Sequence, residues 1–188
     1  MPTTPTGPLS AKSVLRTTLA ACATFQTLVG EPAPAGDPPV DPTDEEIAAY
    51  VLAHIHIDTL PDPADGREHT LAELASRSPY AIVFLAEQGG FRSRKIATGT
   101  WADSFSLRIS LAKLLVGGVA SEEDRVTFDN VISGILSDLR EAAETAGYFD
   151  AMDVAIEDGP WVGHPTGIPA QGLWLGCVLS VSSDPGGD

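Results

Sequence analysis

The chain has 188 residues, with 26 Asp and Glu against 11 Lys and Arg, which gives a formal net charge of −15 at pH 7. Because phosphate contacts need Lys and Arg to displace counterions, this charge argues against sequence-specific binding to nucleic acid. The length suits one domain, and the sequence shows neither a signal-peptide pattern nor an apolar run near the roughly 20 residues of a membrane span, so we expect a soluble, non-secreted protein whose single domain covers residues 1–188.

The first third of the chain predicts a helix, a loop and a strand. Residues 10–30 carry an apolar stripe at helical spacing and end at a glycine, which predicts a helix of about five turns. The stripe consists of Val14, Leu15, Leu19, Cys22, Phe25, Leu28 and Val29. Residues 31–46 contain five prolines, so we expect a loop there. Apolar and polar side chains alternate in residues 49–58, which predicts a strand.

A short helix and three strands are predicted next. Residues 70–77 have the spacing of a short helix, which Pro79 would end. Residues 80–86 are apolar on both faces, as is typical of a central strand. Residues 91–97 and 101–115 follow after short glycine turns, so the three strands are expected to form an antiparallel meander.

The clearest helical signal lies in residues 121–147. Its stripe consists of Phe128, Val131, Ile132, Ile135, Leu136, Leu139, Ala142, Ala143 and Ala146. Ser121 and Asp124 can cap the first amides, and Gly147 can end the helix. The strand before it, residues 104–114, has one apolar face that this helix can cover. We therefore expect a two-layer α+β domain, in which a mixed, mostly antiparallel sheet packs against one long and one shorter amphipathic helix.

The C-terminal part predicts two strands with a long loop between them. Residues 152–157 alternate with charges outward, as in an edge strand. Residues 159–172 contain three prolines and a tryptophan and are interpreted as a loop. Residues 173–181 are apolar on both sides and predict the last strand, and the polar residues 182–188 are expected to form a loosely held tail.

Charge is unevenly distributed along the chain. The net charge is +2 over residues 1–30, −9 over 31–68, +3 over 69–120 and −11 over 121–188. A mildly basic middle between acidic ends could let copies of the chain dock head to tail. The alternative is that the acidic residues serve solubility alone.

The two cysteines, Cys22 and Cys177, lie far apart in apolar sequence. We interpret them as buried, reduced thiols rather than as a disulfide or a metal site.

One arrangement is suggestive of catalysis. On a strand, His54, His56 and Asp58 would share one face and could hold a divalent metal ion such as Zn²⁺. They resemble the start of the His-x-His-x-Asp-His signature of metallo-β-lactamase-like hydrolases, but Thr59 replaces the last histidine. The alternative, which we favour, is two half-exposed histidines on the outer face of a strand, with no metal, no cofactor and no enzymatic activity.

Two segments are candidates for contact with another protein. The region 91–95 carries the one basic cluster of the sequence, and aromatic and aliphatic residues on the loop 159–172 commonly anchor interfaces. The candidate interface residues are Arg92, Arg94, Lys95, Trp161, His164 and Ile168. For the basic cluster, the alternative is a solvated hairpin edge without function.

The order of these elements resembles the tail-terminator and neck proteins of long-tailed bacteriophages. The resemblance rests on residues 15–21 and 27–30 of the first helix, the strand 104–115, and the start of the long helix from Phe128 to Leu139. It implies a structural virion protein without catalytic residues, assembled in the host cytoplasm. Such a protein forms a ring, typically a hexamer, that ends the tail tube and joins it to the head.

The implied partners are further copies of the chain, the tail-tube protein and the head-completion or neck proteins. DNA would pass through the lumen without sequence-specific contacts. The proline-rich loop departs from the compact form of tail terminators, which leaves another neck position open. The competing hypotheses are the metal-dependent hydrolase and a small cytosolic binding domain.

Overall fold

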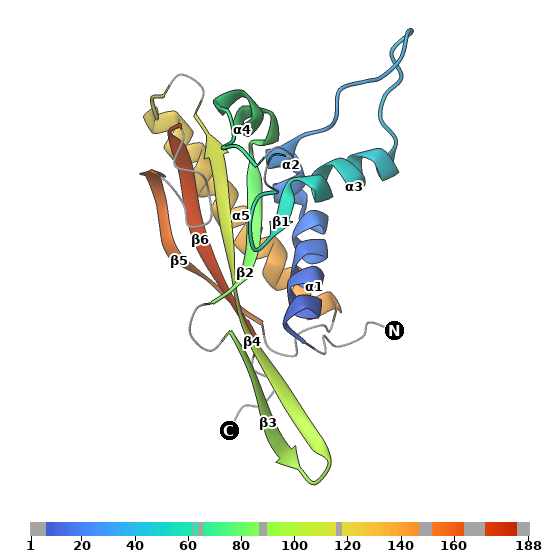
Figure 1. Cartoon of the computed structure of the whole chain (residues 1–188), viewed down its shortest axis with the longest axis vertical. Helices are drawn as coiled ribbons and strands as arrows, with labels where there is room; N and C mark the ends of the chain where they lie inside the picture. The colour runs from blue at the N-terminus through green and yellow to red at the C-terminus, as the bar shows by residue number, and fades with distance from the viewer. Residues whose placement is uncertain are drawn as a thin grey trace.

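A single sheet with helices mainly on one face forms the body of the protein (Figure 1). The computed structural model describes residues 7–61, 63, 66–86, 90–115, 118–146, 152–163 and 172–183. The helices of this part are α1 (Pro8–Ala21), α2 (Ala23–Val29), α3 (Asp44–Ala53), α4 (Leu71–Arg77) and α5 (Glu122–Ala146). Its strands are β1 (Ile55–Ile57), β2 (Tyr80–Leu85), β3 (Phe91–Ala97), β4 (Thr100–Leu114), β5 (Met152–Gly163) and β6 (Trp174–Ser183).

The six strands form a mixed sheet in the order β1-β2-β4-β6-β5, with β3 paired to β4 outside this path. β1 and β2 are parallel, and all the other pairs are antiparallel. The structure therefore has the predicted two-layer α+β architecture with a mostly antiparallel mixed sheet. The predicted short helix and long helix correspond to α4 and α5.

The expected meander is wrong in its pairing. β2 and β3 both pair with β4, one after the other along the same edge, so that Leu85 lies opposite Leu107 and Phe91 lies opposite Phe105. β4 is 15 residues long, which leaves its first part free to pair with β3 beyond the end of β2. As a result, β3 and the start of β4 form a hairpin that extends away from the body (Figure 1).

The first predicted helix is two helices, which meet at Cys22. Cys22 has an extended backbone, with φ −67° and ψ 120°, so α1 ends before it and α2 begins after it. The amide of Thr24 donates to Asp138 Oδ2 on α5 at 2.8 Å, which satisfies one of the free amides at the start of α2. A Cβ on Gly134 would lie only 2.7 Å from Thr24 Cγ2, so a glycine lets α5 approach α2 this closely.

The strand predicted for residues 49–58 is wrong in its first half, because residues 49–53 belong to α3. Thr43 and Glu46 form a capping box that starts a helix at Asp44, and the strand that follows, β1, has three residues. The proline-rich loop consequently ends at Thr43 rather than at residue 46. The spacing of Ile47, Tyr50 and Val51 fits a helix as well as the alternation fits a strand.

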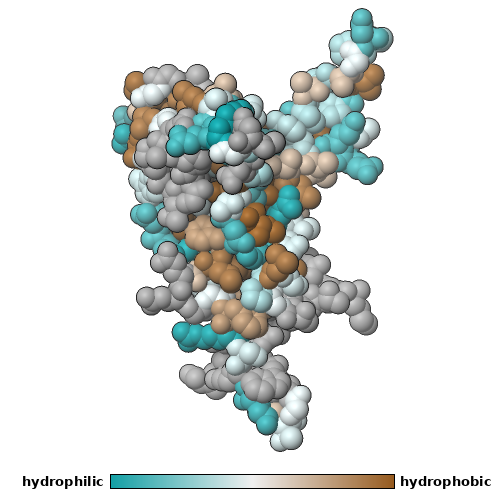
Figure 2. Space-filling model, viewed as in Figure 1, coloured by the Kyte–Doolittle hydropathy of each residue, from teal (hydrophilic) through white to brown (hydrophobic). Residues whose placement is uncertain are grey.

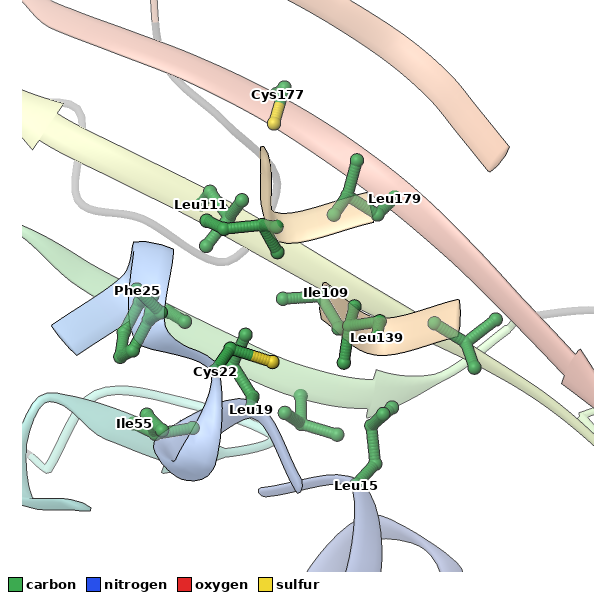
Figure 3. Packing of buried hydrophobic residues seen from close by; sticks show 14 of the residues in the cluster. Leu15, Leu19, Cys22, Phe25, Ile55, Ile109, Leu111, Leu139, Cys177 and Leu179 are labelled. Carbon is green, nitrogen blue, oxygen red and sulfur yellow. The ribbon is translucent and has the colours of Figure 1, made fainter. Parts of the chain in front are cut away.

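The main core lies between the sheet and the helices α1, α2 and α5 (Figure 3). Phe25, Ile135 and Leu139 are fully buried in it, together with Ile109 of β4. Val131 is partly buried against the same cluster. The apolar stripe of α5 is buried, as predicted. It packs mainly on β5 and α2, however, rather than on the strand predicted for residues 104–114.

A second, smaller core lies on the opposite face of the sheet, beneath α4. Its buried residues are Leu60, Leu74, Tyr80, Ile82, Ala112, Leu114 and Trp174. The rings of Tyr80 and Trp174 are 5.3 Å apart and edge to face. Because Ala81 and Val83 belong to the main core, β2 is buried on both faces, as predicted.

Both cysteines are free and buried, as predicted (Figure 3). Burial, reinforced by Asp138 near Cys22 and by Asp158 near Cys177, raises the pKa of each thiol to about 12. Because the thiolate is the reactive form, we expect a thiol reagent at pH 8 to label neither cysteine in the folded protein and both after denaturation. Rapid labelling of either thiol in the folded protein would show that this part of the core opens readily.

Candidate interaction surfaces

The β3–β4 hairpin extends beyond the helices at one end of the molecule (Figure 1). Its base is joined to the main core through Phe91 and Phe105, whose ring centroids are 5.4 Å apart. Arg92 and Lys95 are exposed on β3. Arg94 lies between them, with its backbone opposite Ala102, but its side chain is outside the described part. The predicted basic cluster is therefore carried on a projecting ribbon.

A second projection, which we call the acidic arm, comprises residues 31–53. It consists of the proline-rich loop and α3, and it extends from the other end of the body (Figure 1). It contains six acidic residues and no Lys or Arg. The six are Glu31, Asp37, Asp41, Asp44, Glu45 and Glu46, and all are exposed. The charge of this segment is evident from the sequence. The strand predicted for residues 49–58 gave no indication that these acidic residues precede and begin a helix.

Local hydrogen bonds hold the acidic arm in shape. Ala35 and Val40 exchange backbone hydrogen bonds of 3.2 and 2.9 Å, which fold the loop back on itself. Thr43 bonds reciprocally with Glu46 at the start of α3, and these bonds lower the pKa of the Glu46 carboxyl. At the base, Arg16 of α1 donates to the Leu52 carbonyl at 2.9 Å. The arm therefore has a defined form although little of it is buried.

A groove of about 550 Å³ runs between the loop and α3 of the acidic arm. Val40, Ala49 and Tyr50 contribute apolar surface, and Asp41 and Glu46 are the acidic residues of its lining. Val40 is 67% exposed. Figure 2 shows hydrophobic and hydrophilic residues side by side on this projection. Such a lining suits a ligand that has both an apolar part and a positive charge.

The structure does not place His54, His56 and Asp58 on one strand face. His54 follows the last residue of α3 and is buried, with its Nδ1 2.8 Å from the Tyr50 carbonyl oxygen. His56 lies on β1, and Asp58 lies beyond it with φ 65°. Both carboxylate oxygens of Asp58 accept from Lys12 Nζ, at 2.8 and 2.6 Å.

The change from helix to strand at His54 separates these side chains. Within the described ranges, no three His, Cys, Asp or Glu side chains are grouped so that they could hold a metal ion. The geometry therefore gives no support to the metal-dependent hydrolase. The absence of a bound metal remains a prediction.

His56 gives the folded protein a sensitivity to acid. Burial, with the positive charges of Arg77 and Arg16 and the nearby His54, lowers the pKa of His56 to about 4, and its Nε2 is buried without a hydrogen-bond partner. The unfolded chain binds this proton near pH 6.5, so stability should fall as the pH decreases from about 6.5 to 4. We expect His56→Gln, which cannot titrate, to reduce this loss in thermal melts. If the melting temperatures of the parent and the variant fell by the same amount across this pH range, the prediction would be wrong.

Trp161 lies within β5 and not on a loop, because β5 continues to Gly163. The loop predicted for residues 159–172 was wrong in its first five residues. Trp161 pairs with Gly176 of β6 and is half-buried, and a Cβ on Gly163 would lie 3.2 Å from its ring. The indole therefore packs over its own strand. Its contact with a neighbour stays a prediction.

Two candidate interface residues, His164 and Ile168, are outside the described part of the chain. The predicted C-terminal tail is only partly described. Its first two residues, Ser182 and Ser183, belong to β6, and residues 184–188 are outside the described part.

Comparison with protein-family models finds no match for the chain, and comparison with curated proteins finds none either. None of the described helices is long and apolar enough to cross a membrane. The function is therefore proposed from the two projections, their charges and the order of the elements.

Proposed function

We propose that the chain is a structural subunit of a bacteriophage tail. In this proposal, copies of the chain form a closed ring as the tail terminator or another neck component, which ends the tail tube and joins it to the head. The resemblance in element order favours this class. The virion is the proposed location, and the tail-tube and head-completion proteins are the proposed partners.

The observation that carries this proposal is the pair of oppositely charged projections at distant ends of one molecule (Figure 1). The β3–β4 hairpin presents Arg92 and Lys95, whereas the acidic arm presents six exposed carboxylates. A contact between the hairpin of one copy and the acidic arm of the next brings opposite charges together, and it can leave the other projection of each copy free for a further neighbour. Repetition of one such contact around an axis produces a ring.

The distribution of burial also favours assembly. Only the bases of the two projections belong to the core, through Val51 of the arm and through Phe91 and Phe105 of the hairpin, and the rest of each projection lies outside it. An ordered segment that buries little surface loses conformational entropy without a compensating free-energy gain, unless it binds a partner. Contact with a neighbour supplies the missing burial.

The test is to add the purified chain to assembled tail tubes of the phage concerned and to image the tube ends by electron microscopy. We expect a ring at one end of each tube, tubes that stop growing, and tubes that become able to join heads. Tubes without the chain are the control. Tubes that continue to grow and stay unjoined in its presence would contradict the proposal.

A further inference from the structure

We propose that the groove of the acidic arm is the docking site for the β3–β4 hairpin of a second copy of this chain. The proposal rests on the ring-forming function proposed above and names the two surfaces that make the contact. It places Arg92 and Lys95 of one copy against the acidic arm of the next.

The groove fits the chemistry of Arg and Lys side chains. These side chains have long apolar stems that pack on apolar surface while the charged group stays in water. Val40 and Ala49 offer such a surface, Tyr50 adds an aromatic ring, and Asp41 and Glu46 are the adjacent carboxylates. One groove thus supplies a partner for the stem and for the charge.

The hairpin can reach such a groove. Its strands pair from Phe91 opposite Phe105 out to Ala97 opposite Thr100, and Gly99, with φ 80°, lies in the turn at the tip. A paired ribbon anchored at its base by two phenylalanine rings keeps its shape and therefore loses little entropy on binding. Arg92 and Lys95 lie along this ribbon, short of its turn, and because they are three residues apart on β3 they project from opposite faces, toward the two walls of the groove.

The contact must join two molecules. Figure 1 shows the hairpin and the acidic arm extending in opposite directions from the body, so the hairpin of one molecule cannot enter its own groove. One molecule carries the hairpin at one end and the groove that receives a hairpin at the other, which is the arrangement that a head-to-tail ring requires.

Exposed ion pairs are weak individually and are screened by salt. The contact should therefore weaken steeply as ionic strength rises. The apolar surface around Val40 and Tyr50 supplies the part of the binding free energy that persists at high salt. The charges mainly set orientation and association rate.

The test uses two charge-reversed variants of the full chain. The hairpin variant carries Arg92→Glu and Lys95→Glu, and the arm variant carries Asp41→Lys and Glu45→Lys. Glu46 is retained because it belongs to the capping box of α3. A control variant, Glu123→Lys with Asp129→Lys, makes the same change of charge as the arm variant at exposed positions of α5. Circular dichroism establishes that all three are folded.

Association is measured by sedimentation at low ionic strength, with carbodiimide crosslinking and mass spectrometry to identify the contact. We expect the parent and the control variant to associate and to yield a crosslink from Lys95 to a carboxylate of the arm. Each charge-reversed variant alone should lose association by at least tenfold. An equal mixture of the two should regain it, because reversed hairpins meet reversed arms in an alternating ring with an even number of subunits.

Three results would overturn the inference: a parent that stays monomeric under these conditions, variants that associate as well as the parent, or a mixture that fails to recover. The proposed function is judged separately, by the tube ends. If the parent terminates tubes while the reversed variants do so equally well, the ring exists but uses a different contact.

Discussion

Truncation of Ile135 to alanine is expected to lower the free energy of unfolding by roughly 2–5 kcal/mol. Ile135 is fully buried on the core face of α5, in the cluster that includes Leu139, Phe25 and strands β4 and β6. Removing three carbon atoms there loses their transfer free energy and leaves a cavity that the two layers cannot fully close. Urea denaturation followed by circular dichroism measures the change.

Val126 provides the matched control on the same helix. It is 55% exposed, so Val126→Ala should change the free energy of unfolding by less than about 0.5 kcal/mol. If Ile135→Ala cost no more than Val126→Ala, α5 would not cover the sheet as described. Alanine has a higher helix propensity than valine or isoleucine, so a cost at either position reflects lost burial.

The second large effect is expected at Trp174, in the core beneath α4. Trp174→Ala should cost about 3–5 kcal/mol, because the side chain is fully buried and contacts the ring of Tyr80 at a centroid distance of 5.3 Å. The variant removes the largest side chain of this second core. The unfolding free energy from urea denaturation tests the size of the loss.

A conservative replacement separates packing from other effects. Trp174→Phe retains an aromatic ring against Tyr80 and should recover a large part of the loss. Leu71, at the start of α4, is 52% exposed, and Leu71→Ala should cost much less than Trp174→Ala. A small cost for Trp174→Ala would mean that the second core adds little to the fold.

The elements with a long, clean period could be predicted from the sequence. The stripe of residues 121–147 gave α5 almost to its ends, because 25 helical residues contain many repeats of one pattern. β2 and β6 were recognisable because they are apolar on both faces. The two-layer class followed from these elements.

Errors occurred where tertiary contacts or overlapping patterns decide the structure. The break at Cys22 is accompanied by the hydrogen bond from Thr24 to Asp138, more than 100 residues away, and no local signal marks it. α3 was missed because its apolar residues also alternate, although the signal Thr43-x-x-Glu46 was present and could have identified its start.

Of the two candidate surfaces, the basic hairpin could be predicted from the sequence and the acidic arm could not. Arg92 and Lys95 stand out because basic residues are rare in this acidic chain, and a hairpin follows from the alternation around Gly99. The acidic surface proposed to receive them is not marked in the sequence, because net charge counts carboxylates without showing which of them project. The acidic arm becomes visible only when α3 and the folded loop are placed together.

Native mass determination of the purified chain, alone and on tail tubes, distinguishes a closed ring from single copies of the chain. We expect a single closed species whose mass is several times the 19.6 kDa of one chain, formed in solution at low ionic strength and found at the tube ends. A chain with the mass of one copy under both conditions, or a ladder of masses without a closed species, would contradict it.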